Sequence, residues 1–502
     1  MSCIAILPKV LRVLLPFTSW LVLIAACAPP QAALMVANGD DVGVLHPQLA
    51  TTSAEGRVML ALHAGLTRLD SATLKPEPNL ASTFHSELGG KKWRFQIRPN
   101  LHWSDGEPLL ATDFLRSWQQ LMDPNFGAPY SEWLQGAKLR LDGDWLHVEF
   151  PSPRPEFAEM CAYQALAPVP AHTTPELACS GPYQIVSRRI RDRIVVEKNP
   201  WFWQADLVQI ERIHFLTIES QFTALNLFLT GDIDYAPAVP ALAIPRLSEE
   251  YSDEFQPSPQ WATYFLRFNT QRPPFNELRH RRAFSAALQP AAIANGVGGG
   301  RQPAFGLVPP GIDGWRLMEA SKSSESNQAK VQKAIQPAAK TSALQVEYLY
   351  NSSELNRDVA EVLQQQWQTE LGITVRLANQ EWKTFLASQK GLDYQISRSS
   401  WVGDYLDPMT FLEIFQSNSG NNRTGWKNRE YDGLLQSARE ATDRGLRLHL
   451  MQQAEVLLLD QAVIMPLFYE NSFELVAKRV LGFQRNLRGY VDWSRLRLEV
   501  TP

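Results

Sequence analysis

Two carboxylates stand close together late in the chain, and paired carboxylates are common tools of general acid–base chemistry. Asp404 and Asp407 are three residues apart in a segment that we predict to be a loop. The rest of the sequence supplies no partners for such chemistry. The nine histidines are scattered singly, and the motifs HExxH, GxSxG and GxxxxGK[ST] are absent. No catalytic constellation is therefore expected, and neither a metal nor a cofactor.

The N-terminal residues 1–26 have the features of an export signal. Lys9 and Arg12 are their only charges, and the apolar run 13–24 is shorter than the roughly 20 residues that a membrane-spanning helix needs. Small residues precede Cys27, as in a bacterial lipobox, in which the thiol is acylated. Ordinary cleavage beside an incidental cysteine is the alternative. We expect a protein of the periplasm or cell envelope, anchored to the membrane by lipid if Cys27 is acylated.

Two of the four cysteines lie well inside the chain. Cys161 and Cys179 form an even pair in an export compartment, where disulfides persist. A bond between them would close a loop of about 18 residues, which is worth about 3 kcal/mol by the chain-entropy argument. A two-cysteine metal site is the alternative, but no CxxC motif or nearby histidine pair supports it. We predict the disulfide.

The composition is that of a globular protein. The 502 residues are 45% hydrophobic and 20% charged, so a sizeable core and more than one structural unit are expected. Forty-eight Lys and Arg against fifty-two Asp and Glu give a net charge of −4, and this balance does not suggest a general nucleic-acid footprint, which would need clustered basic surface. The basic run 279–282 is predicted to be the solvated face of a helix.

Strands and helices alternate along the chain. Residues 93–97 alternate apolar and polar side chains and predict a strand, and Thr112 is predicted to cap a helix that ends before Asp123. Polar residues 321–340 are predicted to be a surface linker followed by a helix. Residues 343–350, 354–370 and 373–377 predict a strand, a helix and a strand in a β-α-β unit. The class is therefore mixed α/β, with parallel crossovers. Further strands are predicted at 183–186, 194–198 and 213–218, and a helix at 221–229.

Several segments, taken together and in order, resemble the family 5 extracellular solute-binding proteins of bacterial ABC importers, and the oligopeptide-binding members in particular. They cover nearly the whole chain after the signal. The matching segments are Trp93–Pro99, His102–Pro108, Thr112–Pro124, Ser180–Tyr183, Lys198–Trp203, Thr230–Asp234, Phe268–Ala283, Val308–Gly311, Asn379–Leu386 and Trp401–Tyr405.

The resemblance implies the type II periplasmic-binding-protein fold, in which two hinged lobes close on a ligand and an extra domain is inserted in the first lobe. The first lobe would be discontinuous, and the second lobe would be 263–470. By the family pattern the first lobe comprises residues 36–63, 164–262 and 471–502, with the inserted domain at 64–163.

The resemblance also implies a ligand site. Asp404 matches the family aspartate that pairs with the ligand α-ammonium. Ser400, Trp401 and Val402 match a backbone edge that pairs with an extended peptide, and Arg398 matches a cation that can meet the peptide carboxylate.

Further positions match as well. Thr51, Thr52 and Ser53 match the facing backbone edge on the first lobe, and Tyr130 matches an aromatic residue from the inserted domain. Asn356 and Gln389 stand where the oligopeptide binder has basic residues for the peptide C-terminus. Both are neutral here, so an altered C-terminal clamp is expected. Ala262 and Val402 replace a family disulfide, and Trp382 is expected to pack in the core.

These implications predict a monomeric substrate-binding component, not an enzyme, that captures oligopeptides and delivers them to the permease subunits of an ABC importer in the inner membrane. The main alternative is a receptor of the same fold for a dedicated ligand, such as a cell-wall peptide, a haem or a metal chelate. A peptide sensor or chaperone without a transporter is a second alternative, and a secreted hydrolase a third. Nucleic acid is not an expected partner.

Overall fold

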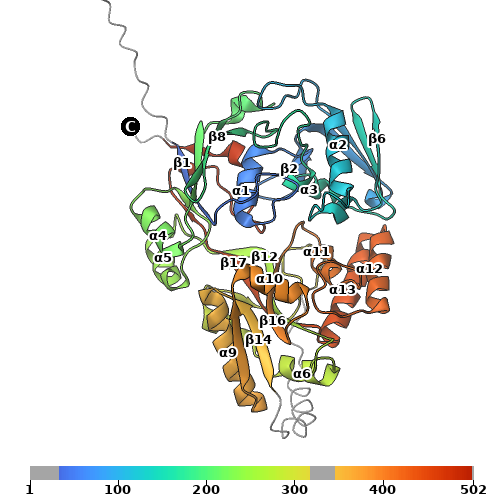
Figure 1. Cartoon of the computed structure of the whole chain (residues 1–502), viewed down its shortest axis with the longest axis vertical. Coiled ribbons are helices and arrows are strands. Elements are labelled where there is room, and N and C mark those ends of the chain that lie inside the picture. Colours follow the sequence, from blue (N-terminus) through green and yellow to red (C-terminus); the bar gives the residue numbers. More distant parts are fainter. Residues whose placement is uncertain (1–32, 317–344, 500–502) are drawn as a thin grey trace, which may run out of the picture. The chain divides into compact units, whose positions relative to one another are not determined.

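The computed structural model describes residues 33–316 and 345–499 (Figure 1). The predicted signal 1–26, Cys27 and the predicted linker 321–340 lie outside these described residues. Among the helices of the described ranges, none is both long and apolar enough to cross a membrane. The strands form two six-stranded sheets, one four-stranded sheet and two short hairpin-like pairs, so the predicted mixed α/β class is confirmed.

The first six-stranded sheet gathers strands from distant parts of the sequence. Its order is β18-β11-β1-β10-β9-β8, with β1 parallel to β10 and β11 and the other pairs antiparallel. Its strands are β1 (Leu34–Gly39), β8 (Tyr183–Arg189), β9 (Arg193–Lys198), β10 (Arg212–Thr217), β11 (Tyr235–Ala236) and β18 (Leu475–Val476). Three helices accompany these segments in the sequence: α1 (Ser53–Leu62), α4 (Gln221–Leu229) and α5 (Ile244–Glu250).

The four-stranded sheet is antiparallel, in the order β4-β5-β7-β6. Its strands are β4 (Ala81–Glu87), β5 (Lys92–Ile97), β6 (Lys138–Asp142) and β7 (Trp145–Glu149). In β5 the apolar residues of the predicted alternation are buried. The helix that follows, α2 (Ala111–Met122), begins before its predicted cap because the carboxylate of Asp113 accepts a hydrogen bond from the Leu110 peptide nitrogen. Thr112 therefore lies inside the helix. The short helix α3 (Phe157–Met160) comes after this sheet.

The second six-stranded sheet has the order β13-β17-β12-β16-β14-β15. Its strands are β12 (Ser258–Phe268), β13 (Gln302–Pro303), β14 (Val346–Asn351), β15 (Val375–Gln380), β16 (Ile396–Val402) and β17 (Ile464–Ser472). β14 runs parallel to β15, and α9 (Glu354–Leu371) connects them, so the predicted β-α-β unit is confirmed. Figure 1 shows α9 beside β14.

Local chemistry fixes both ends of α9. The Ser353 side chain accepts a hydrogen bond from the Asn356 peptide nitrogen, which caps the N-terminus. Gly372 ends the helix at φ 68°, a left-handed conformation that glycine adopts without a Cβ penalty. The buried residues of α9 recur at helical spacing, and all but one of them are apolar. They are Asn356, Val359, Ala360, Leu363, Trp367 and Leu371.

The remaining helices are α6 (Leu278–Ala286), α7 (Pro290–Val297), α10 (Trp382–Lys390), α11 (Met409–Leu412), α12 (Arg429–Glu440) and α13 (Arg444–Asp460). The short strand pairs are β2 (Thr67–Leu69) with β3 (Pro76–Pro78), and β19 (Val480–Leu481) with β20 (Arg497–Leu498). Short 3-10 turns lie at Leu88–Gly90, Ser131–Leu134, Gln164–Leu166, Ala205–Leu207, Ala241–Ala243, Glu413–Phe415 and Trp493–Arg495.

Two expectations about side chains were wrong. Arg281, from the basic run expected on a solvated face, is 5% exposed, and its guanidinium donates to the carbonyl oxygens of Gln461 and Phe275. Trp382, expected in the core, is 47% exposed and stacks on Phe385. Helix periodicity identifies a face, but only the packing partners decide which face is covered.

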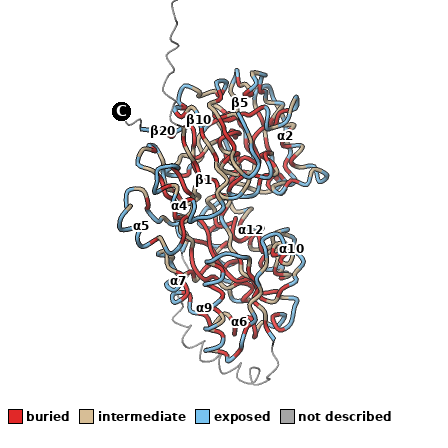
Figure 2. Tube along the Cα trace, turned by 60° about the vertical axis from the view of Figure 1, so that its left-hand side comes forward, coloured by how far each residue is buried: buried red, intermediate tan, exposed pale blue. Residues whose placement is uncertain are grey.

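Buried residues concentrate inside the sheets, whereas helices such as α5 keep an exposed outer face (Figure 2). Two predicted domain boundaries, 262/263 and 470/471, fall inside β12 and β17. These strands are paired neighbours, with Thr263 opposite Tyr469. The chain would thus cross between the predicted lobes twice at one place, an arrangement suited to a hinge. The domain division stays a prediction.

Candidate ligand-binding site

Asp404 lies in the loop between β16 and α11. Its peptide nitrogen donates to the Thr410 hydroxyl at 3.1 Å, and the preceding Gly403 nitrogen donates to the Trp261 carbonyl at 2.8 Å. Gly403 allows this close approach, because a Cβ there would lie 2.1 Å from the Trp261 ring. The Trp261 indole in turn donates to the Tyr405 carbonyl at 2.9 Å. The loop is therefore held from both sides of Asp404.

The Asp404 carboxylate is partly buried and has neither a hydrogen bond nor an ion pair with any residue in the described ranges. Burial raises its pKa to about 7, Arg488 opposes this shift at longer range, and the charges of Glu413 and Glu132 add to it. A cation that approaches such a partly buried, unpaired carboxylate would stabilise its charged form. A ligand ammonium is such a cation.

The charge of Asp404 affects the pKa values of two tyrosines. The hydroxyls of Tyr130 and Tyr163 are 3.1 Å apart, and the rings pack edge to face at 5.2 Å. Burial raises the pKa of both phenols, and the negative charge of Asp404 raises both further. The structure thus brings Tyr130 towards Asp404. It adds Tyr163, which the sequence did not single out because a lone tyrosine carries no motif.

One edge of β16 is open where the predicted peptide-pairing residues lie. On one side β16 pairs with β12 over its whole length, from Ile396 opposite Phe268 to Val402 opposite Ala262. On its other side it pairs with β14 only at Ile396 and Ser397. The backbone of 400–402 on that side thus meets no other strand of the described chain, and an extended ligand can pair with such an edge. Val402 is 47% exposed.

Thr51, Thr52 and Ser53 form a helix N-terminus rather than a facing strand edge. Thr52 caps α1 in a capping box with Glu55. The peptide nitrogens of Thr51 and Thr52 both donate to Glu55, at 2.9 and 3.0 Å, so these donors are already used inside the protein. All three residues are exposed. A ligand could reach their hydroxyls but not the peptide N–H groups of the two threonines.

Asn356 orients Arg398. The Asn356 side chain is 2% exposed and donates to the Asn351 carbonyl. Its oxygen accepts from the Tyr264 hydroxyl at 3.0 Å and from Arg398 Nε at 3.2 Å. Arg398 has no carboxylate within ion-pair distance among the described residues. Its guanidinium is therefore held in position without a direct ion pair in this part of the chain, and its charge acts on the buried Glu470 from longer range.

Gln389 is 3% exposed and is tied to the β16 backbone. Its Nε2 donates to the Ser397 hydroxyl at 2.9 Å and to the Arg398 carbonyl at 2.8 Å, and its Oε1 accepts from Arg423 at 3.3 Å. Asn356 and Gln389, the two neutral residues predicted to stand in place of basic ones, thus have structural partners. Gln389 also brings in Arg423, a cation that the sequence did not single out.

The predicted disulfide between Cys161 and Cys179 is not formed, and both thiols are free and fully buried. Burial raises the pKa of both. The Cys179 thiol donates to the Pro175 carbonyl at 3.6 Å, while Cys161 ends α3 within the main core. An even cysteine count and an oxidising compartment allow a bond, but only the fold decides whether two sulfurs meet.

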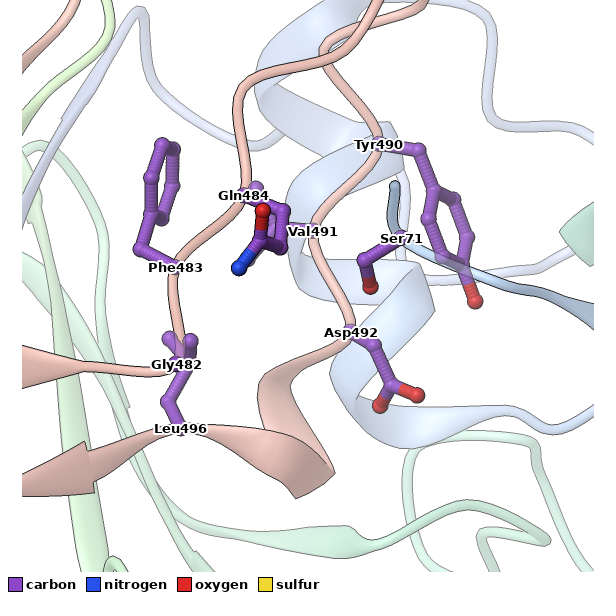
Figure 3. A pocket seen from close by; sticks show the side chains of 8 residues that line it. All are labelled: Ser71, Gly482, Phe483, Gln484, Tyr490, Val491, Asp492 and Leu496. Atoms are coloured by element: carbon purple, nitrogen blue, oxygen red, sulfur yellow. The ribbon is translucent and has the colours of Figure 1, made fainter. Parts of the chain in front are cut away.

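The pocket in Figure 3 lies elsewhere. Ser71 and residues of the C-terminal segment 482–496 line it, and none of the predicted ligand-binding residues does. In the described ranges, no group of three or more His, Cys, Asp or Glu side chains is placed to hold a metal ion. The open β16 edge, Asp404 and the tyrosines are therefore the best-defined candidate site.

Comparison with known proteins agrees with this fold. Residues 75–423 match the bacterial extracellular solute-binding proteins, family 5, and the chain belongs to this family. Its fold is accordingly that of the type II periplasmic binding proteins.

Three relatives illustrate the similarity. The probable deoxycholate-binding periplasmic protein of Escherichia coli K12 is 30% identical, covering 94% of this chain and 97% of its own. The periplasmic oligopeptide-binding protein of the same organism is also 30% identical, covering 89% and 88%. Among solved structures, Haemophilus influenzae OppA in complex with the peptide RPPGFSPFR has a TM-score of 0.85 at 26% identity, covering 94% and 99%.

Proposed function

We propose that the protein captures oligopeptides in extended form and hands them to the permease of an ABC importer. The observation that carries this proposal is the unpaired Asp404 carboxylate directly after an open strand edge. Main-chain pairing to residues 400–402 would supply affinity without reading side chains, and Asp404 would hold the ligand α-ammonium. Similarity to oligopeptide-binding proteins supports this assignment.

Binding would be followed by release and not by turnover. Ligand contacts to both predicted lobes would stabilise a closed state, and the ATP that drives import would be hydrolysed by other subunits. The protein would work as a monomer in the periplasm or cell envelope, where relatives carry the description periplasmic. Acylation of Cys27 would add a membrane anchor.

Native mass spectrometry of gently purified protein tests the proposal. We expect a ladder of bound masses that yields intact di- to pentapeptides on denaturation. A single non-peptide mass would overturn it. Recovery of cleaved products from an added peptide would instead argue for a hydrolase.

A dedicated ligand is the second candidate function. The similarity to a probable deoxycholate-binding protein and the neutral Asn356 and Gln389 favour it. Deoxycholate has a carboxylate but no amine, so it would leave Asp404 unpaired. Calorimetric titration of the protein, freed of bound ligand, with deoxycholate and with a free-amine tripeptide separates the two candidates. If the protein binds peptides as proposed, we expect a heat of binding only with the tripeptide.

A further inference from the structure

Arg267 in β12 is a buried cation without a counter-charge. Its side chain is 3% exposed, Nε has no hydrogen-bond partner, and no ion pair or hydrogen bond of its guanidinium occurs within the described ranges. The contacts that it does make are with aromatic faces: the guanidinium carbon lies 5.4 Å from the Phe265 ring centre and 5.9 Å from that of Phe415. Rings stabilise a cation only weakly and leave its donors free.

A chain of hydrogen bonds links the strand position opposite Arg267 to a second cation, Arg423. Ser397 stands directly opposite Arg267 in the β12–β16 register, so the two side chains share one face of the sheet. The Ser397 hydroxyl accepts from Gln389, and Gln389 accepts from Arg423. Arg423 is partly buried and, like Arg267, has no carboxylate within ion-pair distance in the described chain. Two cations therefore lie around one serine–glutamine pair.

Among the described residues, no carboxylate contributes to the electrostatic shift of the Arg267 pKa. Burial lowers the pKa of Arg267 to about 10, and the neighbouring charges of Arg423 and Arg398 lower it further. Tyr394 is the single group that opposes the shift, and burial raises the pKa of this phenol, which keeps it neutral. Arg267 thus remains a cation at neutral pH. An unpaired buried charge is strongly unfavourable, so an anion that enters this place would be held firmly.

We propose that Arg267 and Arg423 form a carboxylate-binding site. The carboxylate would come either from the captured ligand, as an acidic side chain or C-terminus, or from a free anion of the medium. The first of these two cases depends on the peptide-binding function proposed above. Ser397 lies about 17 Å along β16 from Val402, at about 3.3 Å per residue, a span that an extended ligand of about five residues covers. Because β14 occupies the edge at Ser397, the last residues of such a ligand would lie over the face of the sheet that carries the Arg267 and Ser397 side chains. The site would replace the clamp that the neutral Asn356 and Gln389 no longer provide.

The first experiment compares Glu and Gln at each position of a free-amine pentapeptide, by calorimetry with stripped wild type, Arg267→Met and Arg423→Met. We expect at one position at least tenfold tighter binding of Glu, and loss of that preference in both variants. The second experiment follows the thermal unfolding midpoint as acetate rises at constant ionic strength. A site filled by free anion would raise the wild-type midpoint by about 2 °C or more and leave that of Arg267→Met unchanged.

Arg281→Met is the matched control. Arg281 is also a buried arginine, but its donors are satisfied by carbonyl oxygens, so its loss should lower the midpoint at every acetate concentration. Arg267→Met should instead be as stable as wild type, or more stable, without acetate, because it removes an uncompensated charge.

The outcomes separate the two proposals. A Glu preference that needs Arg267 supports the ligand carboxylate, and an acetate response alone supports a free anion in the same site. If peptides fail to bind while acetate still stabilises wild type through Arg267, the proposed function fails and the anion site stands. If wild type shows neither a Glu preference nor an acetate response, the anion site is wrong.

Discussion

The peptide nitrogen of Leu406 donates a 2.8 Å hydrogen bond to the carboxylate of Glu159, which precedes it by 247 residues. The bond ties α3 to the loop that carries Asp404. Beside it, Arg447 of α13 forms an ion pair with Asp407 and lies 3.8 Å from Glu156. The position of Asp404 therefore depends on residues from distant parts of the chain.

Asp404→Asn should weaken binding of a free-amine tripeptide by about 2–5 kcal/mol, because it removes the charge that would hold the α-ammonium in a partly buried place. Calorimetry gives the affinity. The N-acetylated peptide should bind wild type and variant alike. Asp393→Asn is the control, since Asp393 is exposed and pairs with Arg272. Equal binding of free and acetylated peptide by wild type would contradict the role of Asp404.

Peptide affinity should fall as the pH drops below about 7. The raised pKa of Asp404 means that its carboxyl is protonated in acid and cannot then pair with an ammonium. Each pH unit well below 7 should cost up to about tenfold in affinity. Binding near pH 7 should release protons, which calorimetry in buffers of different ionisation enthalpy measures. Asp404→Asn should abolish both effects, and their persistence would assign them to another group.

Glu159→Ala should loosen the Asp404 loop. Loss of a hydrogen bond to a carboxyl group is worth about 1.5–3 kcal/mol, so we expect a comparable loss of free-amine peptide affinity. Hydrogen exchange at the Leu406 amide should accelerate. Glu159→Gln keeps an acceptor oxygen and should retain most of the protection. An unchanged Leu406 exchange rate in the alanine variant would show that other contacts hold the loop.

Glu455 should make stability fall as the pH rises from about 4.5 to about 7. Its carboxyl is fully buried, and one oxygen accepts from the Leu307 and Val308 nitrogens while the other has no partner among the described residues. Burial raises its pKa to about 7. The folded state therefore binds a proton that the unfolded state has released in this window, and the effect is at most about 3 kcal/mol.

Glu455→Gln should flatten this part of the stability profile, measured by denaturant unfolding at several pH values. Glu361→Gln, at an exposed position of α9, should leave the profile of wild type unchanged. A variant profile that still falls between pH 4.5 and 7 would place the responsible proton elsewhere.

Cys161 and Cys179 should resist alkylation in the folded protein and react fully after denaturation without reductant, because both thiols are buried and free. Peptide mapping by mass spectrometry reads each cysteine separately. If both cysteines stay unmodified in a denatured, unreduced sample, the two thiols form a disulfide and the prediction is wrong.

Local sequence patterns determined much of this protein. The alternation in β5, the helical face of α9 and the β-α-β order depend on periods of two and 3.6 residues, which the chain itself carries. Such periodic features could be predicted because they are local. The roles of Asp404 and of residues 400–402 were instead predicted from a family resemblance, and strand pairing decides that the edge of β16 is open there.

Tertiary structure alone decided the rest. Arg281 and Arg267 look like ordinary surface cations in sequence, yet both are buried, and of the two only Arg267 has no hydrogen bond or ion pair within the described ranges. The Glu159–Leu406 bond and the separation of the two cysteine thiols depend on where segments far apart in sequence meet. Burial and pairing are properties of the packed chain, because they are set by the desolvation and the neighbours that each side chain finds after folding.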